Sequence, residues 1–308
     1  MEFAILGPLR VYEQDRIYAP TAPKQRQLLA LLLLNANQVV STSTCIEELW
    51  EDNPPNTALS TLQSYILQLR RMLKQVPRIG SLQAARHVLE TRGGGYLLSV
   101  GTHELDVNVF ADLVREGRAA LGKDDVHASR VLGQALTMWK GGALSDVTAG
   151  PILRTHLAGL EENRTSVQEQ RIDADLRLGR HHELLGELSA LTTQYPTHEH
   201  LHAQFMLALY RSGRRIQALG VVQRLREVLH DELGLEPSPA IRHLHQAILA
   251  CDAAIEAPGE RDTLLSLDQA ARAGHAGHAG HAGHGKRGAG HPRPVPEVAA
   301  FLPRAVDR

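Results

Sequence analysis

The most regular alternation of apolar and polar residues in the chain lies between residues 57 and 74. Apolar side chains recur there at steps of three and four, at Leu59, Leu62, Ile66, Leu69 and Leu73. This spacing places them on one face of an α-helix, which predicts an amphipathic helix with one buried side. Two prolines stop any earlier helix just before it, and Asn56 or Thr57 offers a side-chain oxygen that can cap the first turn.

The opposite face of this predicted helix is polar. It carries short hydrogen-bonding groups followed by cations, at Thr57, Thr61, Ser64, Gln68, Arg71 and Lys74. A helix that lies in the major groove of DNA needs such groups, because short polar side chains reach base edges and cations meet phosphates. An ordinary solvated helix also has a polar face, so the neighbouring segments must decide between the two interpretations.

The neighbouring segments predict a small domain of strands and helices over residues 1–100. Short strands are expected within residues 2–18, then a helix capped by Thr21 and a second one near Thr44, where Thr44 and Glu47 fit a capping box. Near residue 90, two strand-like runs flank glycines 93–95, which predicts a hairpin with a flexible tip and Arg92 at its edge. Strands, three helices and a hairpin are the order of a winged helix. We expect a fragment ending near residue 100 to fold on its own core.

Residues 103–255 predict a stack of amphipathic helices. Leu178-Gly179-Arg180 and Ser212-Gly213-Arg214 form an internal repeat with a spacing of 34 residues, which is typical of tetratricopeptide helix pairs. Apolar stripes run through the whole segment, for example at Phe110, Leu113, Val114 and Leu121. Such stacks bury their faces against each other and leave a groove that binds partners rather than substrates.

Charge adds to this picture through its distribution and not through its total. The 308-residue chain has a formal net charge of -1, which by itself gives no sign of a nucleic-acid partner. Residues 57–92, however, contain a single carboxylate, Glu90, among six cations: Arg70, Arg71, Lys74, Arg78, Arg86 and Arg92. A neutral protein with one basic stretch can bind DNA through that stretch.

The remaining chemistry favours neither an enzyme nor a metalloprotein. Histidines are abundant, and the pair His181-His182 or the pair His198 and His200 could serve as ligands, but no carboxylate or cysteine stands at a metal-site spacing beside them. We therefore expect solvated histidines, no catalysis, no cofactor and no metal.

Two further features describe the setting in which the protein works. The cysteines Cys45 and Cys251 are far apart and match no redox motif, so both are expected to be reduced and buried. The longest apolar run, residues 28–34, is too short to cross a membrane, and the N-terminus has no basic leader. These features predict a cytoplasmic protein without a membrane partner.

The last fifty residues differ in composition from the rest. Residues 256–308 contain a low-complexity run of glycine, alanine and histidine, with His275, His278, His281 and His284 at every third position. Glycine and alanine cannot offset the entropy lost on ordering, so a disordered tail is expected. Its histidines give it at most an incidental affinity for transition metals.

The first hundred residues resemble the OmpR-type winged-helix domain of the Streptomyces antibiotic regulatory protein family. The matching stretches are FAILGPLRV, PKQRQLLALLLLNANQVVS, ELWEDNPPNTALSTLQSYILQLRRMLK and LETRGGGYLL. In this family the third helix enters the major groove and the wing reaches the neighbouring minor groove. The resemblance implies contacts with base edges or sugars from Thr57, Thr61, Ser64, Tyr65 and Gln68. It implies contacts with the DNA backbone or minor groove from Arg71, Lys74 and Arg92.

The segment from His103 to Cys251 resembles the bacterial transcriptional activation domain of the same family. The matching stretches are ELDVNVFADL, ALTMWKGGALSDV and LREVLHDELGLEPSPAIRHLHQAIL. The resemblance implies an all-helical domain that contacts RNA polymerase or its sigma factor, pairs protomers on DNA, or does both.

Together these observations predict a mainly α protein: an N-terminal winged helix-turn-helix domain (1–100), an all-α tetratricopeptide-like domain (103–255) and a disordered tail (256–308). The expected function is sequence-specific activation of transcription of an antibiotic gene cluster. Its expected partners are double-stranded promoter DNA, bound by a homodimer on direct repeats, and RNA polymerase. The alternative is a helical-repeat scaffold or adaptor without DNA-binding activity.

Overall fold

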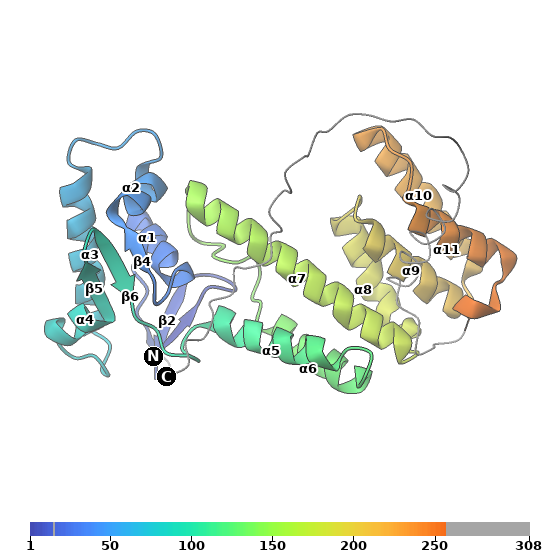
Figure 1. Ribbon diagram of the computed structural model, residues 1–308, viewed down its shortest axis with the longest axis horizontal. Coiled ribbons are helices and arrows are strands. Elements are labelled where there is room, and N and C mark those ends of the chain that lie inside the picture. Colours follow the sequence, from blue (N-terminus) through green and yellow to red (C-terminus); the bar gives the residue numbers. More distant parts are fainter. Residues whose placement is uncertain (15, 257–308) are drawn as a thin grey trace, which may run out of the picture.

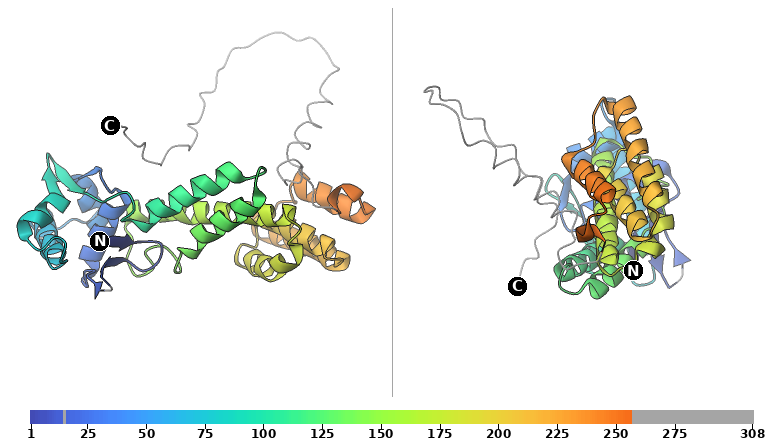
Figure 2. Two further views of the ribbon diagram at one scale, coloured as in Figure 1. Left: turned by 90° about the horizontal axis from the view of Figure 1, so that it is seen from below. Right: turned by 90° about the vertical axis from the view of Figure 1, so that its right-hand side faces the viewer.

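The computed structural model describes residues 1–14 and 16–256, which form an elongated and mainly α-helical molecule (Figures 1 and 2). The predicted fold class is confirmed, because small sheets and a winged-helix arrangement at the N-terminus are followed by a helical region. The predicted disordered tail and its histidines lie outside the described residues. Within the part of the chain that the structure describes, no helix is both long and apolar enough to span a bilayer.

The N-terminal region contains two three-stranded antiparallel sheets and four helices. The first sheet consists of β1 (Glu2–Ala4), β2 (Arg10–Glu13) and β3 (Arg16–Ile17), in that order. The second sheet has the order β4 (Val39–Ser41), β6 (Gly95–Leu98) and β5 (Leu89–Arg92). The helices are α1 (Pro23–Leu34), α2 (Thr42–Trp50), α3 (Ala58–Lys74) and α4 (Leu82–Val88). The predicted strands, three helices and hairpin are all present, whereas β4 and α4 were not predicted.

The helix caps differ from those predicted. Ala22 occupies the cap position of α1 and makes no side-chain bond, so Thr21 is not the cap. The cap of helix α2 lies three residues earlier than expected, at Ser41 instead of Thr44, because Ser41 is extended at the end of β4 and its hydroxyl accepts from the Thr44 N–H at 3.0 Å. Thr57 precedes α3 with a near-helical backbone (φ -95°, ψ 12°), and its hydroxyl accepts from no first-turn N–H.

The C-terminal region is built from seven α-helices and a short 3₁₀ helix among the described residues. They are α5 (Asp106–Ala120), α6 (Asp125–Thr137), α7 (Pro151–Arg177), α8 (His181–Gln194), α9 (Glu199–Arg211), α10 (Arg215–Leu233), α11 (Pro239–Ala250) and the 3₁₀ helix Ala253–Ile255. Helix α7 runs from the winged helix, beside α5 and α6, to the group formed by α8–α11 (Figure 1).

The 34-residue repeat is visible in the backbone. Gly179 and Gly213 take left-handed conformations, with φ of 76° and 74°, at the ends of α7 and α9. The next residue bonds back in the same way each time, from the Arg180 N–H to the Asp175 carbonyl at 3.0 Å and from the Arg214 N–H to the Leu209 carbonyl at 2.9 Å. These bonds satisfy carbonyls at the helix ends and allow the next helix to turn back.

The hydrophobic core of the winged helix lies mostly within residues 1–100 and is completed by three leucines from beyond them. Its buried cluster combines residues of α1, α2, α3 and the sheets with Leu105, Leu144 and Leu153. In addition, the Phe3 N–H donates to the Glu104 carbonyl at 2.6 Å, which places the start of the second region beside β1. Residues 1–100 therefore supply most, but not all, of the core on which a fragment ending near residue 100 was expected to fold.

A buried carboxylate on α2 fastens the two regions together. Glu48 is 0% exposed and lies at the N-terminus of α7, where its Oε1 accepts from the Gly150 N–H at 2.6 Å. Its Oε2 accepts from the Ile152 and Leu153 N–H groups at 3.0 and 2.9 Å. First-turn N–H groups lack partners within a helix and the helix dipole favours an anion there, so Glu48 acts as a cap supplied from a distant element.

Two further carboxylates bind backbone N–H groups of the loop between β1 and β2. The Asp106 carboxylate accepts from the Ile5 N–H at 2.9 Å and from the Leu6 N–H at 2.9 Å. Burial raises the pKa of Asp106, while the backbone hydrogen bonds act in the opposite direction. Asp146 accepts from the Leu9 N–H at 2.8 Å and pairs with Arg26 of α1 at 2.5 Å. The orientation of the winged helix relative to α5 and α7 is thus held by polar contacts as well as by the shared core.

Candidate nucleic-acid interface

Helix α3 has the two faces that the sequence predicts, with one exception. The buried face consists of Ala58, Leu62, Ile66, Leu69 and Leu73. Leu59 was expected on this face but is 52% exposed. It lies in the first turn, directly after the exposed loop 51–57, where Ala58 takes the inward position and leaves Leu59 in solvent.

The polar face of α3 is presented to solvent. Thr57, Ser64, Gln68, Arg71 and Lys74 are exposed, and Thr61 is half-buried. The Ser64 hydroxyl donates to the Ser60 carbonyl at 2.9 Å, so its oxygen is left to accept from an external donor. The carboxamide oxygen of Gln68 accepts from Gln25 of α1, which leaves the Gln68 amide nitrogen as an outward donor. The face therefore offers both acceptors and donors at the surface.

Tyr65 lies at the edge of this row. Its ring is half-buried and stacks on Trp50 of α2, with ring centroids 6.4 Å apart and an interplanar angle of 17°. The stack ties α3 to α2, so Tyr65 has a packing role that the sequence did not indicate. Its half-exposed edge remains beside the polar face.

Arg70 joins α3 to the wing. Its Nε donates to the Leu89 carbonyl at 2.9 Å and its Nη2 donates to the Thr91 hydroxyl at 2.8 Å. Burial, followed by the charge of neighbouring Arg86, lowers the pKa of Arg70. Arg70 therefore positions the β5–β6 hairpin against α3, and Arg86 adds an exposed cation on α4 that the predicted site did not include.

The tip of the wing is hydrogen-bonded to the start of α2, and its flexibility stays a prediction. Gly94 has a φ of 81°, which favours glycine, and its carbonyl accepts from the Thr42 N–H at 2.8 Å and from the Thr42 hydroxyl at 3.0 Å. Arg92, 55% exposed, pairs with Glu90 at 2.8 Å. The wing thus presents Arg92 from a hairpin that is tied to the start of α2.

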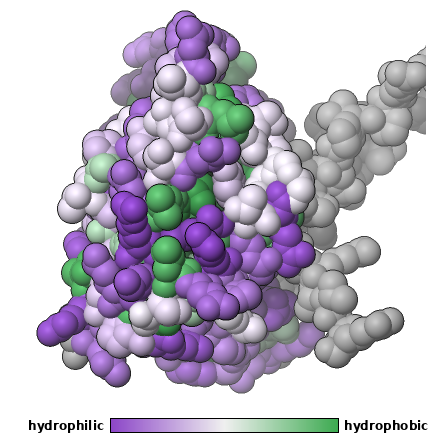
Figure 3. Space-filling model, turned by 90° about the vertical axis from the view of Figure 1, so that its left-hand side faces the viewer, coloured by the Kyte–Doolittle hydropathy of each residue, from purple (hydrophilic) through white to green (hydrophobic). Residues whose placement is uncertain are grey.

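Three exposed cations of α3 and α4 form neither an ion pair nor a side-chain hydrogen bond among the described residues. Arg70 and Arg92 have the partners given above, and Arg78 pairs with Glu104 at 2.7 Å. The three cations without a partner among the described residues are Arg71, Lys74 and Arg86, and all three are exposed. Helices α3 and α4 and the wing lie together at one end of the elongated molecule, and that end is covered mainly by hydrophilic side chains with a few apolar ones between them (Figures 1 and 3).

Two of the four histidines singled out from the sequence contact carboxylates of α7, whereas His182 is exposed. His198 lies 3.2 Å from a Glu169 oxygen, and His200 lies 3.5 Å from an Asp173 oxygen, so α9 meets α7 through these pairs. The expectation of solvated histidines is therefore wrong for His198 and His200, because both are half-buried between two helices. The described residues contain no cluster of three or more histidine, cysteine, aspartate or glutamate side chains placed to hold a metal ion.

The two cysteines have different environments. Cys45 is buried in the core of the winged helix, and burial raises the pKa of its thiol to about 12, so it stays protonated and unreactive. Cys251 was also expected to be buried but is exposed. It follows the last residue of α11 in a left-handed conformation (φ 52°), which turns it away from the packed face of that helix.

Comparison with known proteins covers both regions. Residues 19–98 match the family described as "Transcriptional regulatory protein, C terminal", and residues 105–249 match the "Bacterial transcriptional activator domain". The solved structure of Mycobacterium tuberculosis EmbR in complex with a low affinity phosphopeptide superposes with a TM-score of 0.77. It is 31% identical in sequence, over 89% of this chain and 70% of that chain.

Named relatives align with most of the described residues. The regulatory protein DnrI of Streptomyces peucetius is 46% identical over 260 residues, which is 84% of this chain and 96% of DnrI. The transcriptional regulator RedD of Streptomyces coelicolor is 33% identical over 84% of this chain and 73% of RedD. The regulatory protein AfsR of Streptomyces coelicolor is 37% identical over 83% of this chain, which spans only 25% of AfsR. The chain therefore belongs to the Streptomyces antibiotic regulatory protein family of transcriptional activators.

Proposed function

We propose that this protein binds promoter DNA in a sequence-specific manner and recruits RNA polymerase to an antibiotic gene cluster in the cytoplasm, without catalysing a reaction. The observation that carries the proposal is the exposed polar row of α3, which has the unpaired cations Arg71 and Lys74 at its C-terminal end and the wing beside it. Such a helix combines groups for base edges with groups for phosphates.

The exposed residues divide into three roles in this proposal. Thr57, Thr61, Ser64 and Gln68 face base edges in the major groove, with Tyr65 against a sugar at the margin. Arg71 and Lys74 meet phosphates. Arg92 enters the adjacent minor groove, where phosphates on both sides focus negative potential, and it exchanges Glu90 for DNA when it does so.

The helical region supplies the second half of the proposed activity. We propose that residues 103–255 pair two protomers on direct repeats and contact RNA polymerase or its sigma factor. Support comes from the match to the activator domain over residues 105–249 and from the stacked helix pairs, which present surface grooves for protein partners. Because Glu48 of α2 holds the start of α7, the helical region keeps a defined orientation relative to the winged helix that is bound to DNA.

Two α3 variants are expected to weaken DNA binding in different ways. Gln68→Ala should cost about 1–3 kcal/mol at one base position, because its carboxamide can bond an adenine at two points when the Gln68 oxygen exchanges Gln25 for the base. Arg71→Ala should weaken cognate and random duplexes alike and lower the salt slope by about one, because it removes a phosphate contact. Fluorescence anisotropy with cognate and single-base-changed duplexes over a range of salt concentrations measures both effects.

The matched controls lie on the same surface. Gln63→Ala changes an exposed glutamine of α3 outside the polar row, and Arg78→Ala removes an exposed arginine that is paired with Glu104. Both should bind cognate DNA like the parent protein. Equal losses on cognate and random DNA for Gln68→Ala would remove Gln68 from the set of base-reading residues.

Changes at the wing should alter affinity and leave base preference intact. Arg92→Ala removes the proposed minor-groove cation, so affinity should fall by about 1 kcal/mol for every sequence. Glu90→Ala releases Arg92 from its 2.8 Å ion pair, so affinity should rise. Binding to a panel of duplexes measures both, and an unchanged affinity for Arg92→Ala would mean that the wing does not touch DNA.

A further inference from the structure

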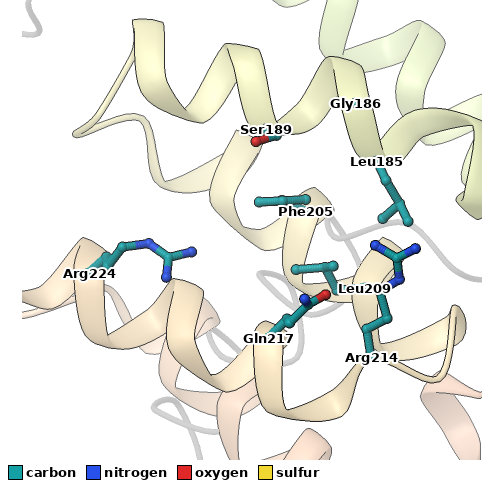
Figure 4. Close-up of a pocket in the computed structure, with 8 residues that line it drawn as sticks. All are labelled: Leu185, Gly186, Ser189, Phe205, Leu209, Arg214, Gln217 and Arg224. Carbon is teal, nitrogen blue, oxygen red and sulfur yellow. The ribbon is translucent and has the colours of Figure 1, made fainter.

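A groove of about 450 Å³ lies between α8 and α10, at the far end of the molecule from the winged helix. Helix α9 forms its floor, where Phe205 and Leu209 lie beside Leu185 of α8 (Figure 4). Phe205 and Leu185 are only half-buried, although both pack on the core beneath them. The groove thus offers an apolar surface that these described helices leave uncovered.

One wall of the groove is cationic. Arg214 and Arg224 line it from the α10 side, both are exposed, and neither pairs with a carboxylate among residues 1–14 and 16–256. The remaining polar lining, Ser189 and Gln217, is neutral, and no aspartate or glutamate of the described part of the chain lines the groove. Arg214 and Arg224 are ten residues apart in the sequence, which corresponds to roughly 15 Å along a helix, or about three turns.

The opposite wall contains a glycine that the chain itself does not require. Gly186 lies within α8 and lines the groove, and a Cβ built on it would meet no atom within 4 Å. Glycine inside a helix costs about 1 kcal/mol relative to alanine. A close approach of a partner's backbone to this wall accounts for a glycine there, since a side chain would occupy the space.

We propose that this groove binds an acidic amphipathic helix of a partner protein. The partner's apolar stripe packs on Leu185, Phe205 and Leu209. Two carboxylates about three turns apart on its edge pair with Arg214 and Arg224. This inference goes beyond the proposed function, because it does not depend on DNA binding or on the partner being RNA polymerase.

The shape and chemistry of the groove favour a helix over a small molecule. Small-molecule sites enclose most of their ligand, whereas this groove is open along its length. Helix-in-groove recognition instead uses apolar anchors at steps of three and four residues, which suits an apolar floor between two walls. Arg214 and Arg224 attract carboxylates near the two ends of such a helix, and they repel a helix that carries basic residues there.

The test uses the full chain and two synthetic fluorescent peptides in an anisotropy titration. Each peptide is a helix of about 18 residues with one leucine stripe, and two edge positions three turns apart carry either glutamate or lysine. The parent protein should bind the glutamate peptide and reject the lysine peptide. The double variant Arg214→Glu/Arg224→Glu should reverse this preference, with about a tenfold change for each peptide.

A second variant blocks the groove without removing a core side chain. Gly186→Phe adds a ring on the open wall, so it should abolish binding of the glutamate peptide while helix content by circular dichroism stays unchanged. The control Arg226→Glu makes the same substitution at one site of α10 outside the lining residues, where Arg226 forms an exposed pair with Glu236, and should bind like the parent.

Three outcomes would overturn the proposal. One is equal binding of both peptides by the parent, and another is unchanged binding by Gly186→Phe. The third concerns the chain's own segment 260–268, which also combines acids with leucines. If the glutamate peptide binds a chain ending at residue 256 but not the full chain, that segment is the occupant and the groove is not a site for a partner.

Discussion

Replacing Glu48 with alanine is expected to lower the free energy of unfolding by about 3–5 kcal/mol, which is a large share of the stability of an ordinary domain. The substitution leaves the N–H groups of Gly150, Ile152 and Leu153 without an acceptor at a buried helix end. It also removes a partner of the Gln27 amide, which donates to Glu48 at 2.9 Å. Urea unfolding followed by circular dichroism measures the loss.

The neighbouring residue provides a matched control. Glu47 is exposed on the same helix, so Glu47→Ala should change the free energy of unfolding by no more than about 0.5 kcal/mol.

A substitution at the start of α7 tests the same interface. Gly150→Ala should also destabilise the protein, because the added Cβ would lie 2.1 Å from the Glu48 carbonyl oxygen. The double variant Glu48→Ala/Gly150→Ala should lose less than the sum of the single losses, because Glu48→Ala also removes the Oε1 atom that would lie 2.7 Å from the added Cβ. A Glu48→Ala protein as stable as Glu47→Ala would show that this carboxylate does not hold α7 in place.

The second large effect is expected on the folding of fragments that end at different residues. A fragment of residues 1–100 is expected to unfold without a cooperative transition and to bind no operator. It lacks Leu105, Leu144 and Leu153 of the shared core, and burial of each leucine contributes about 1.5–3 kcal/mol. It also lacks Asp106, Asp146 and the helix end that Glu48 caps, so its losses rival the total stability of a domain, roughly 5–15 kcal/mol.

A fragment of residues 1–177 should behave differently. It keeps the shared core, all three carboxylate contacts and the whole of α5, α6 and α7, so we expect cooperative thermal unfolding and recognition of the same operator. It lacks α8–α11 and with them the groove, so it should bind no glutamate peptide and should fail to activate transcription with purified polymerase. Cooperative unfolding and footprinting by the 1–100 fragment would show that the winged helix needs no support from the second region. Full activation by the 1–177 fragment would place the polymerase contact outside α8–α11.

Local pattern was enough to predict much of the fold and the position of the candidate DNA-binding face. Apolar residues recur every three or four positions along residues 58–74, and this spacing indicates which side of the helix is buried. The pattern depends only on residues a few positions apart in the sequence. The same holds for the β5–β6 hairpin around its glycines and for the two turns at Gly179 and Gly213, where a left-handed residue is needed. Resemblance to a family then added the expected roles of individual side chains, which periodicity alone does not contain.

Contacts between distant segments could not be predicted in this way. Nothing near Glu48 in the sequence distinguishes it from Glu47, yet one caps a helix more than 100 residues away and the other faces solvent. Arg70 and Arg71 are likewise adjacent and equally basic, but helical geometry turns Arg70 toward Leu89 and Thr91 of the wing while Arg71 stays exposed.

Apart from α4, the sequence by itself therefore indicated the helices, the hairpin, the repeat and the outward face of α3, because each depends on side chains that are neighbours along the chain. Only the tertiary structure decided which charged groups are engaged within the protein and which remain for a partner. It also placed Leu185, Phe205 and Arg224 around one groove from three separate helices. The physical reason is that burial and pairing depend on the distance between elements in space, and a periodic pattern within one element carries no information about that distance.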